Sequence, residues 1–330
     1  MTYKIEYLKL KNLIIKNKVC LAPMAGITDA PFRKMVRKWS KDCLIFTEMI
    51  NATMFATAKK YNSVLDIIPE DHPIAYQFSG DEPYYFAKAA ERAQKVGAVD
   101  VDINMACPMP LLVKKGHGAA LLKDIDKARI IIEETVKSVD IPVTLKMRTG
   151  WDSESIIVKE FVQMAESLGI AGITIHGRTR EQCYQGSVNL DLIKEAQELV
   201  SIPIMGSGDI WSPDDAKRMM DYTKCAAVWV ARGSIGKPWR VAQIDSYLRT
   251  GKIEPEINNN DMLDSYFEHL NLMTEFMGEK RAIQRSRNHF IFCTKDMQNN
   301  KEFIKKINFA NTQKEVLEIL NEYKIYLAQF

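Results

Sequence analysis

The sequence predicts an α/β protein: a (β/α)8 TIM barrel followed by a small C-terminal all-helical domain. Eight short apolar runs recur over the first 230 residues, and helical patterns separate most of them. Most of these runs end in loops with glycine or polar residues, which is typical of the C-terminal face of such a barrel. The length of 330 residues fits a barrel of roughly 250 residues plus a small extra domain.

The expected elements follow one another along the chain. We expect a β-hairpin over 3–18 and barrel strands at 19–21, 44–46, 74–78, 99–103, 143–146, 172–175, 202–205 and 226–230. Helical patterns cover 82–96, 125–139 and 153–168, and a further helix opens at 119–122. Asp29 is placed to cap a helix that carries Pro31 and Phe32.

The chain divides near residue 250. Residues 250–260 contain Gly251, Pro255 and three consecutive asparagines, which is typical of a linker. Residues 262–330 have helical spacing and no clear strand. We therefore expect two domains, a barrel over 1–249 and a helical domain over 250–330.

Composition excludes several classes of protein. The net charge of +3 is small, so a nucleic-acid site must rest on local clusters of basic residues. The six cysteines form no CxxC pair, which argues against zinc and against a disulfide framework. The N-terminus is rich in lysine and lacks the apolar core of a signal peptide. We expect a cytoplasmic, monomeric protein with no metal and no membrane segment.

Residues with reactive or polar side chains lie at the ends of several predicted strands. Pro108 has no N–H and pushes Cys107 out of helical geometry, so the fourth strand ends there and presents Asn104 and a thiol. A lone cysteine is more often a buried structural residue, and a strand-end lysine such as Lys146 is more often a solvated charge. His176 fits equally a core histidine or a ligand contact. Neighbouring motifs decide between these alternatives.

Seven sequence motifs decide between the structural and the functional interpretation of these residues. They are APMAGITDAPFR, QFSG, DINMACP, VTLKMRTGW, ITIHGRTR, GSGDI and ARGSIGKPW. Together they closely resemble the tRNA-dihydrouridine synthases, most like the bacterial B-type branch, strongly over residues 10–245 and weakly beyond. The resemblance implies FMN as cofactor, NADPH as reductant, and reduction of the C5–C6 double bond of uridine in the tRNA D loop. It also implies an FMN-binding barrel and a tRNA-binding helical domain.

The resemblance assigns roles to individual residues. Cys107 matches the catalytic cysteine, which protonates C5 after hydride addition at C6, and Asn104 matches its neighbour at the substrate. The implied FMN contacts are Pro23, Met24, Ala25, Gln77, Lys146, His176, Ser207, Gly208, Asp209, Ala231 and Arg232. Departures from the family pattern are Ala106, Ser207 and Ala231, where glycine, asparagine and glycine are usual.

Basic residues gather in two places. Lys114, Lys115, Arg148, Arg178 and Arg180 all follow strand C-termini, and we expect them on the rim of the barrel. In the tail, the basic cluster comprises Lys280, Arg281, Arg285 and Arg287. We interpret Lys114, Arg178 and Arg180, and in the tail Arg281, Arg285 and Arg287, as phosphate contacts to tRNA; the alternative is a solvated helix face. Removing Arg285 with Arg287 is expected to leave flavin reduction unchanged.

Two other functions stay open at this point. One is an FMN-dependent enzyme of the dihydroorotate or dihydropyrimidine dehydrogenase type that acts on a free pyrimidine. The other is a catalytically silent tRNA-binding protein. The first offers no reason for the basic tail, and the second offers none for Cys107, Lys146 and His176 together.

Overall fold

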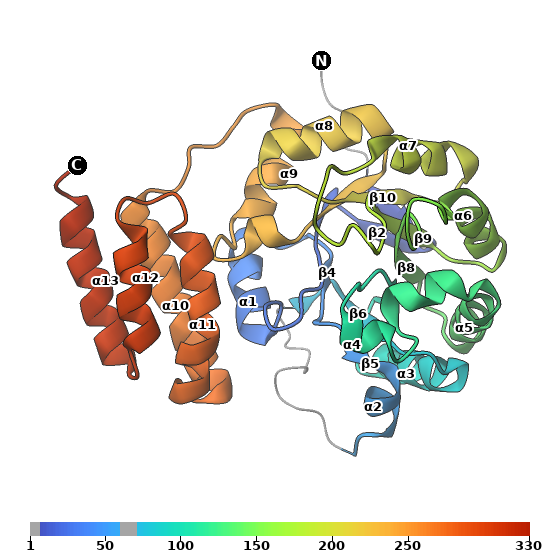
Figure 1. Ribbon diagram of the computed structural model, residues 1–330, viewed down its shortest axis with the longest axis horizontal. Helices are drawn as coiled ribbons and strands as arrows, with labels where there is room; N and C mark the ends of the chain where they lie inside the picture. Colours follow the sequence, from blue (N-terminus) through green and yellow to red (C-terminus); the bar gives the residue numbers. More distant parts are fainter. Residues whose placement is uncertain (1–6, 60–70) are drawn as a thin grey trace.

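A closed barrel of eight parallel strands forms the larger part of the chain (Figure 1). The computed structural model describes residues 7–59 and 71–330. The barrel strands are β3 (Val19–Leu21), β4 (Ile45–Phe46), β6 (Ile74–Ser79), β7 (Asp100–Met105), β8 (Val143–Arg148), β9 (Gly172–His176), β10 (Ile204–Ser207) and β11 (Ala227–Val230). They pair in this order, and β11 returns to β3 to close the ring. All eight predicted strands are therefore confirmed, with ends shifted by one or two residues.

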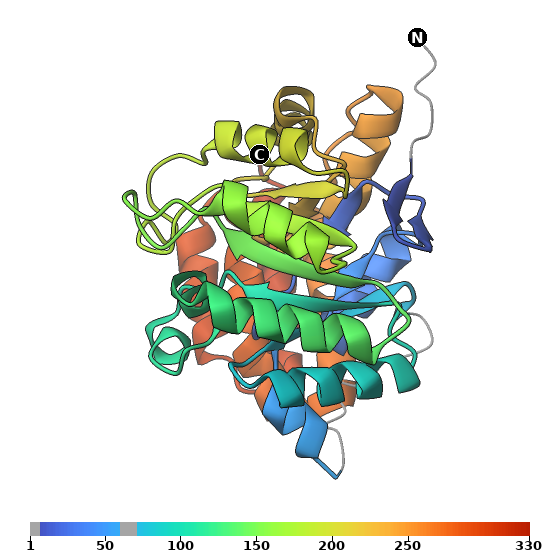
Figure 2. The same ribbon diagram turned by 90° about the vertical axis from the view of Figure 1, so that its right-hand side faces the viewer.

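Helices cover the outside of the barrel, and Figure 2 shows several of them in one layer outside the strands. They are α1 (Ala30–Trp39), α3 (Pro83–Lys95), α5 (Ile125–Ser138), α6 (Val158–Ser167), α7 (Leu190–Leu199), α8 (Pro213–Thr223) and α9 (Arg240–Thr250). The predicted cap is confirmed, because the Asp29 carboxylate accepts a hydrogen bond from the Phe32 N–H at 3.1 Å. Short extra elements are β5 (Ile50–Asn51), α2 (Ala52–Thr57) and α4 (Pro110–Val113).

Two predicted helix starts are wrong. The helix expected from residue 153 begins only at Val158, because the Asp152 carboxylate accepts from the Ser155 hydroxyl and the Glu154 N–H and holds a turn instead. The helix expected at 119–122 is a 3-10 helix, Gly118–Lys123. Its first residue has φ +60°, and a Cβ there would lie 2.8 Å from the Cys107 carbonyl oxygen, so glycine is required.

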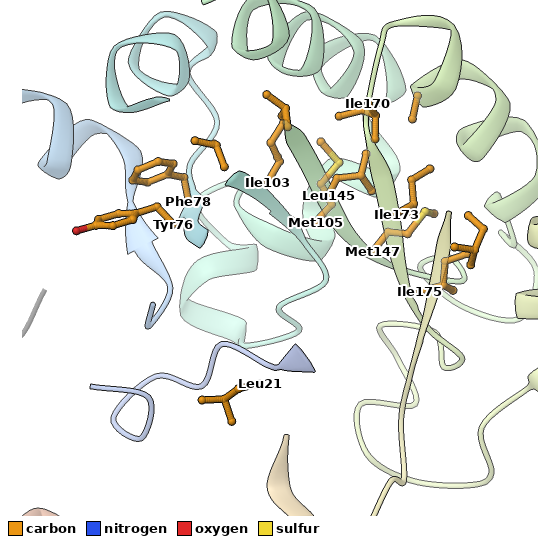
Figure 3. Close-up of a cluster of buried hydrophobic side chains, with 14 of the residues drawn as sticks. Leu21, Tyr76, Phe78, Ile103, Met105, Leu145, Met147, Ile170, Ile173 and Ile175 are labelled. Atoms are coloured by element: carbon orange, nitrogen blue, oxygen red, sulfur yellow. The ribbon is translucent and has the colours of Figure 1, made fainter. Parts of the chain in front are cut away.

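Strand side chains alternate between two environments. Outward-facing residues of β6 to β9 pack under the helices, including Phe78, Ile103, Leu145 and Ile173 (Figure 3). Inward-facing residues are apolar around Phe46 and Trp229, whereas β7 and β8 carry inward polar residues along their whole length, beginning with Asp100 and Thr144. The inner apolar part centres on Trp229, whose ring centroid lies 4.1 Å from that of Phe46. Alternation thus separates the apolar layer under the helices from the barrel interior, whose polar residues extend up to the cavity.

A hairpin closes the lower end of the barrel. Its strands are β1 (Leu8–Leu10) and β2 (Leu13–Ile15), within the predicted span 3–18, of which residues 3–6 lie outside the described residues. Leu8 and Leu10 are fully buried in the same cluster as Trp229. A Cβ on Gly172 would lie 2.7 Å from the Leu10 side chain, so this glycine makes room for the hairpin.

Four helices form the C-terminal part, which lies beside the barrel next to α1 (Figure 1). They are α10 (Asn259–Met277), α11 (Glu279–Cys293), α12 (Asn300–Phe309) and α13 (Gln313–Leu327). Residues 251–258, between α9 and α10, form no regular element. The helices have their own buried cluster, which also takes in Trp239 from the last barrel loop. The prediction of helices after residue 262 is confirmed.

Candidate active site

A cavity of about 460 Å³ opens at the C-terminal ends of the barrel strands. All eleven residues predicted as cofactor contacts line this cavity. They are Pro23, Met24, Ala25, Gln77, Lys146, His176, Ser207, Gly208, Asp209, Ala231 and Arg232. Cys107 and Asn104 line the same cavity. Its volume is in the range of pockets that hold small molecules and cofactors, roughly 300–1,000 Å³.

Two aspartates lie buried beneath the cavity. The Thr144 hydroxyl lies 2.8 Å from both the Asp100 and the Asp102 carboxyl groups. A hydroxyl has one hydrogen, so it donates to one carboxyl and accepts from the other, which must carry a proton. Burial raises the pKa of Asp100 well above its ordinary range and that of Asp102 to about 6. Asp100 is therefore the protonated partner.

The Asp102 carboxylate fixes the direction of a chain of hydrogen bonds. It accepts from the Gln77 amide nitrogen at 2.7 Å, so the Gln77 oxygen is free to accept from the Asn104 amide nitrogen, also at 2.7 Å. The Asn104 oxygen in turn accepts from the backbone N–H of Cys107 at 2.9 Å. Both amides therefore have a remaining N–H for a ligand in the cavity.

A cation and a neutral imidazole complete the floor. Burial, with the Arg148 charge adding to it, lowers the pKa of Lys146 to about 7, against the opposing effect of Asp102. Burial beside Lys146 and Arg148 lowers the pKa of His176 well below its usual value, so this imidazole is neutral at pH 7. The floor thus offers N–H donors and a lysine that titrates near neutrality, a set suited to an electron-rich ligand edge.

The Cys107 thiol faces this floor. Partial burial raises its pKa, and the positive charges of Arg148 and Lys146 oppose that rise only in part. The thiol is therefore protonated at pH 7. The Ala119 N–H donates to the Cys107 carbonyl at 3.0 Å, and Arg148 donates to the Ala106 carbonyl at 2.8 Å. The loop is held on both sides of Cys107, and Ala106 fits within it.

The outer wall of the cavity carries the glycine loop after β10. Gly208 has φ +122°, and a Cβ there would lie 2.8 Å from the Val188 side chain, so only glycine fits. The Asp209 carboxylate receives Arg178 at 2.9 Å and Arg232 at 3.3 Å. Arg232 keeps about a third of its side chain exposed. It is the more accessible of the two arginines that pair with Asp209.

Two arginines predicted on the rim are buried. Arg178 is 2 % exposed and also donates to the carbonyls of Gln185 and Gly186, so it is not open to a phosphate as expected. Arg148, likewise 2 % exposed, donates to the carbonyls of Thr179 and Cys183. Both ends of each guanidinium serve the loops around the cavity. The rim prediction is wrong for these two because a planar five-donor group satisfies several carbonyls at once.

Some of the remaining basic residues are exposed to solvent, and others contact the protein. Lys114 and Lys115 are exposed, and Arg180 lies over the Trp151 ring at 4.6 Å. In α11, Arg281 is exposed. Its neighbour Arg285 instead faces the barrel.

Arg285 and Arg287 make contacts inside the protein. Arg285 lies 3.3 Å from the Glu48 carboxylate and 3.6 Å from that of Asp29. Glu48 also accepts from the Gly26 N–H, next to the cavity residues Met24 and Ala25. Arg287 donates to the Ala310 carbonyl at 3.2 Å. Arg285 therefore contacts the barrel close to the cavity, although it belongs to the helical part of the chain.

Comparison with known proteins decides the family. A family profile described as dihydrouridine synthase (Dus) matches residues 20–328. The chain belongs to this family. A tRNA-dihydrouridine synthase B from Pasteurella multocida is 37 % identical over 94 % of this chain and 93 % of its own. A probable tRNA-dihydrouridine synthase from Rickettsia bellii is 34 % identical over 92 % of this chain and 94 % of its own. The predicted resemblance is confirmed, and the protein is a flavin-dependent enzyme of the dihydrouridine synthase family.

Solved structures agree on the barrel. An old yellow enzyme homologue from Zymomonas mobilis has a TM-score of 0.56 at 13 % identity, over 77 % of this chain and 94 % of that one. Histamine dehydrogenase from Rhizobium has a TM-score of 0.59 at 17 % identity, over 81 % of this chain and half of that one. At these identities the likeness concerns the fold alone. In the described part of the chain, no helix has the length and apolar character to cross a bilayer.

Sequence reasoning missed four residues of this dihydrouridine synthase site. Asp102 lies in the DINMACP motif, and its inward register together with Asn104 could have placed it below the cavity. Glu48 lies two residues after the short strand β4, which is a usable signal. Tyr184 and Trp211 both line the cavity, but they follow the strands at distances that no pattern connects.

Proposed function

We propose that this protein reduces the C5–C6 double bond of a uridine in the D loop of tRNA, using FMN and NADPH. The observation that carries the proposal is Cys107, a protonated thiol in the same cavity as Gln77, Lys146 and His176. One acid facing one cation and several donors is the arrangement that a hydride transfer followed by a protonation needs.

The residues present fit FMN. Gln77, with one unused amide N–H, and Lys146 would bond the nitrogen and oxygen edge of its ring system, and Pro23, Met24 and Ala25 would pass along it. The glycine at 208, which no larger residue can replace, and Arg232 suit its phosphate. Ser207 and Ala231 still present backbone N–H groups there. When bound and reduced, this cofactor supplies the hydride for C6 of the uracil.

Cys107 supplies the proton. Addition of hydride at C6 leaves enolate character between C5 and the 4-carbonyl, and C5 must then be protonated. A thiol with a raised pKa is fully protonated at pH 7 yet transfers its proton readily to a carbanion-like centre. Asn104, which bonds the Cys107 backbone, holds the thiol in place and keeps an N–H for the base.

The RNA must bring its uridine into the cavity. A base stacked in the D loop cannot reach Cys107, so it must leave its stack. Exposed Lys114 and Arg281, with half-buried Arg180, are the cations of the proposed tRNA contact surface. In this proposal the barrel domain, 1–249, binds FMN and the helical domain, 250–330, binds tRNA together with the barrel rim.

The experiment is reduction by the purified protein with three substrates offered separately: unmodified tRNA, uracil and orotate. We expect FMN to be released on denaturation, and NADPH oxidation to yield dihydrouridine only with tRNA. Consumption of orotate or uracil instead would favour the free-pyrimidine enzyme. Flavin reduction without any product from tRNA would favour a silent tRNA-binding protein.

A further inference from the structure

Two exposed aromatic side chains lie at the mouth of the cavity. Tyr184, in the loop after β9, is 51 % exposed, and Trp211, in the loop after β10, is 38 % exposed. Most large aromatic residues of the barrel are buried, so two open rings beside the same opening need an explanation. Neither ring contributes to the apolar clusters of the barrel or of the helices.

Cations lie against both rings. The Arg232 guanidinium is 4.7 Å from the Tyr184 ring centroid and 5.0 Å from that of Trp211. The Lys295 ammonium is 5.5 Å from the Trp211 ring. Flat aromatic faces with adjoining positive charge are the combination that binds single-stranded nucleic acid: bases stack on the rings, and the cations attract phosphates.

The arrangement extends across both parts of the chain. Lys295 follows α11, whereas Trp211 and Tyr184 belong to the barrel. A Cβ on Gly236 would lie 2.4 Å from the His289 carbonyl oxygen, so the barrel and α11 approach closely beside this surface. A surface that spans two domains at the cavity mouth is larger than one small cofactor requires, and this favours RNA over a dinucleotide.

We propose that Tyr184 and Trp211 form a stacking platform for the RNA bases that flank the uridine in the cavity. A base that turns out of the D loop leaves its two neighbours without a stacking partner. The platform replaces those lost contacts at the position where they are lost. This inference rests on the proposed function, because it takes tRNA to be the substrate.

The test measures binding of an unmodified tRNA transcript to the FMN-loaded protein at several salt concentrations. Trp211→Ala and Tyr184→Ala should each raise the Kd between about fivefold and a hundredfold, the range for loss of one stacked base. The slope of log Kd against log salt should stay the same, because no phosphate contact is lost. Trp211→Phe, which keeps a flat ring, should retain most of the affinity.

A matched control is available on the barrel. Tyr222 is 49 % exposed, has Lys194 at 5.7 Å from its ring, and does not line the cavity. Tyr222→Ala should leave the tRNA Kd unchanged. Flavin absorbance and thermal unfolding establish that every variant is folded, and Trp211→Leu, which keeps an apolar side chain without a flat ring, carries the test if an alanine variant is not.

Three results would overturn the platform. The first is a Kd within twofold of wild type for both alanine variants. The second is a raised KM for NADPH at constant tRNA affinity, which would assign the rings to the reductant. The third is a flatter salt slope, which would mean that the rings act only by holding Arg232 and Lys295. Failure of the wild-type protein to form dihydrouridine would instead refute the proposed function, so the two failures are distinguishable.

Discussion

The barrel mouth and helix α11 both carry a group of basic residues, but they are built differently. At the mouth, Arg148 and Arg178 are buried and hold loops, while Arg180 and Arg232 lie on aromatic rings. Among the described residues, no aromatic ring lies against the arginines of α11: Arg281 is exposed, and Arg285 faces the barrel. Basic residues that are clustered in the sequence can therefore have unrelated structural roles.

Helix geometry explains the division on α11. Residues four apart share a helix face, so Arg281 and Arg285 lie on the same side, with Arg285 one turn nearer the barrel. Arg287 is two residues from Arg285, about 200° around the helix, so it lies on the side opposite to Arg285, where it reaches Ala310. The basic cluster is therefore not one phosphate-binding face.

The largest difference between the two regions should be in chemistry. Cys107→Ala removes the proton donor of the mouth, and we expect dihydrouridine formation to fall by about 10²–10⁴-fold. Flavin content and its reduction by NADPH should stay near wild type, because they do not use this proton. Rapid-mixing measurements of the two half-reactions test this; product formation at the wild-type rate would remove Cys107 from the mechanism.

The next effect concerns Arg285 and Arg281. Arg285→Met leaves Glu48 and Asp29 without their cation, and we expect a loss of about 1–3 kcal/mol in unfolding free energy and weaker flavin binding. Arg281→Met, one turn away and exposed, should change neither and should flatten only the salt dependence of tRNA binding. Urea unfolding and flavin titration compare the two. Equal behaviour of both variants would contradict the division of α11.

A pH profile sharpens the description of the mouth. Lys146 has a pKa of about 7, so it is cationic below neutrality and loses its proton as the pH rises through 7. Binding of an electron-rich flavin edge favours the cation, so flavin affinity should fall by up to about tenfold per pH unit above 7. Riboflavin, which has no phosphate to titrate, is the ligand to use. Lys146→Met should abolish this dependence, and a slope that survives the substitution would assign it to another group.

The two aspartates under the cavity should differ from each other in their effect on stability. Asp100→Asn keeps a donor toward Thr144 and should change stability at pH 7 by less than about 1 kcal/mol. Asp102→Asn places a second donor against Gln77 or Thr144 and should cost about 1–3 kcal/mol. Thermal unfolding of both variants gives the ranking; the reverse order would mean that Asp102 carries the proton.

The same pair predicts a direction with pH. The folded pKa of Asp102, about 6, lies above its ordinary value, so the folded state retains a proton that the unfolded chain releases. The stability this contributes is fully present below about pH 4 and is lost as the pH rises through 6. Asp102→Asn should therefore flatten the stability profile between pH 4 and 7.

Sequence reasoning went furthest where local patterns decide the structure. The barrel strands are short apolar runs with glycine or polar ends, and the side chains at those ends gathered around one cavity. Sequence patterns did not predict whether a long side chain extends into solvent or contacts the protein. Arg178 and Arg285 carry the same group as Arg281, and only the positions of Asp209 and Glu48 in space decide which guanidinium pairs with the protein. Tyr184 and Trp211 meet through Arg232 from three different loops, which no spacing along the chain encodes.

The way the ring closes has a consequence for synthesis of the chain. Val19 of β3 pairs with Val228 of β11, and Leu10 of the hairpin packs against Gly172. At about 5–20 residues per second, roughly 10–40 seconds pass on the ribosome between the first strand and its last neighbour. During that interval the edge of β3 and the apolar hairpin have no final partners. The nascent chain is therefore expected to need protection from premature pairing until β11 has emerged.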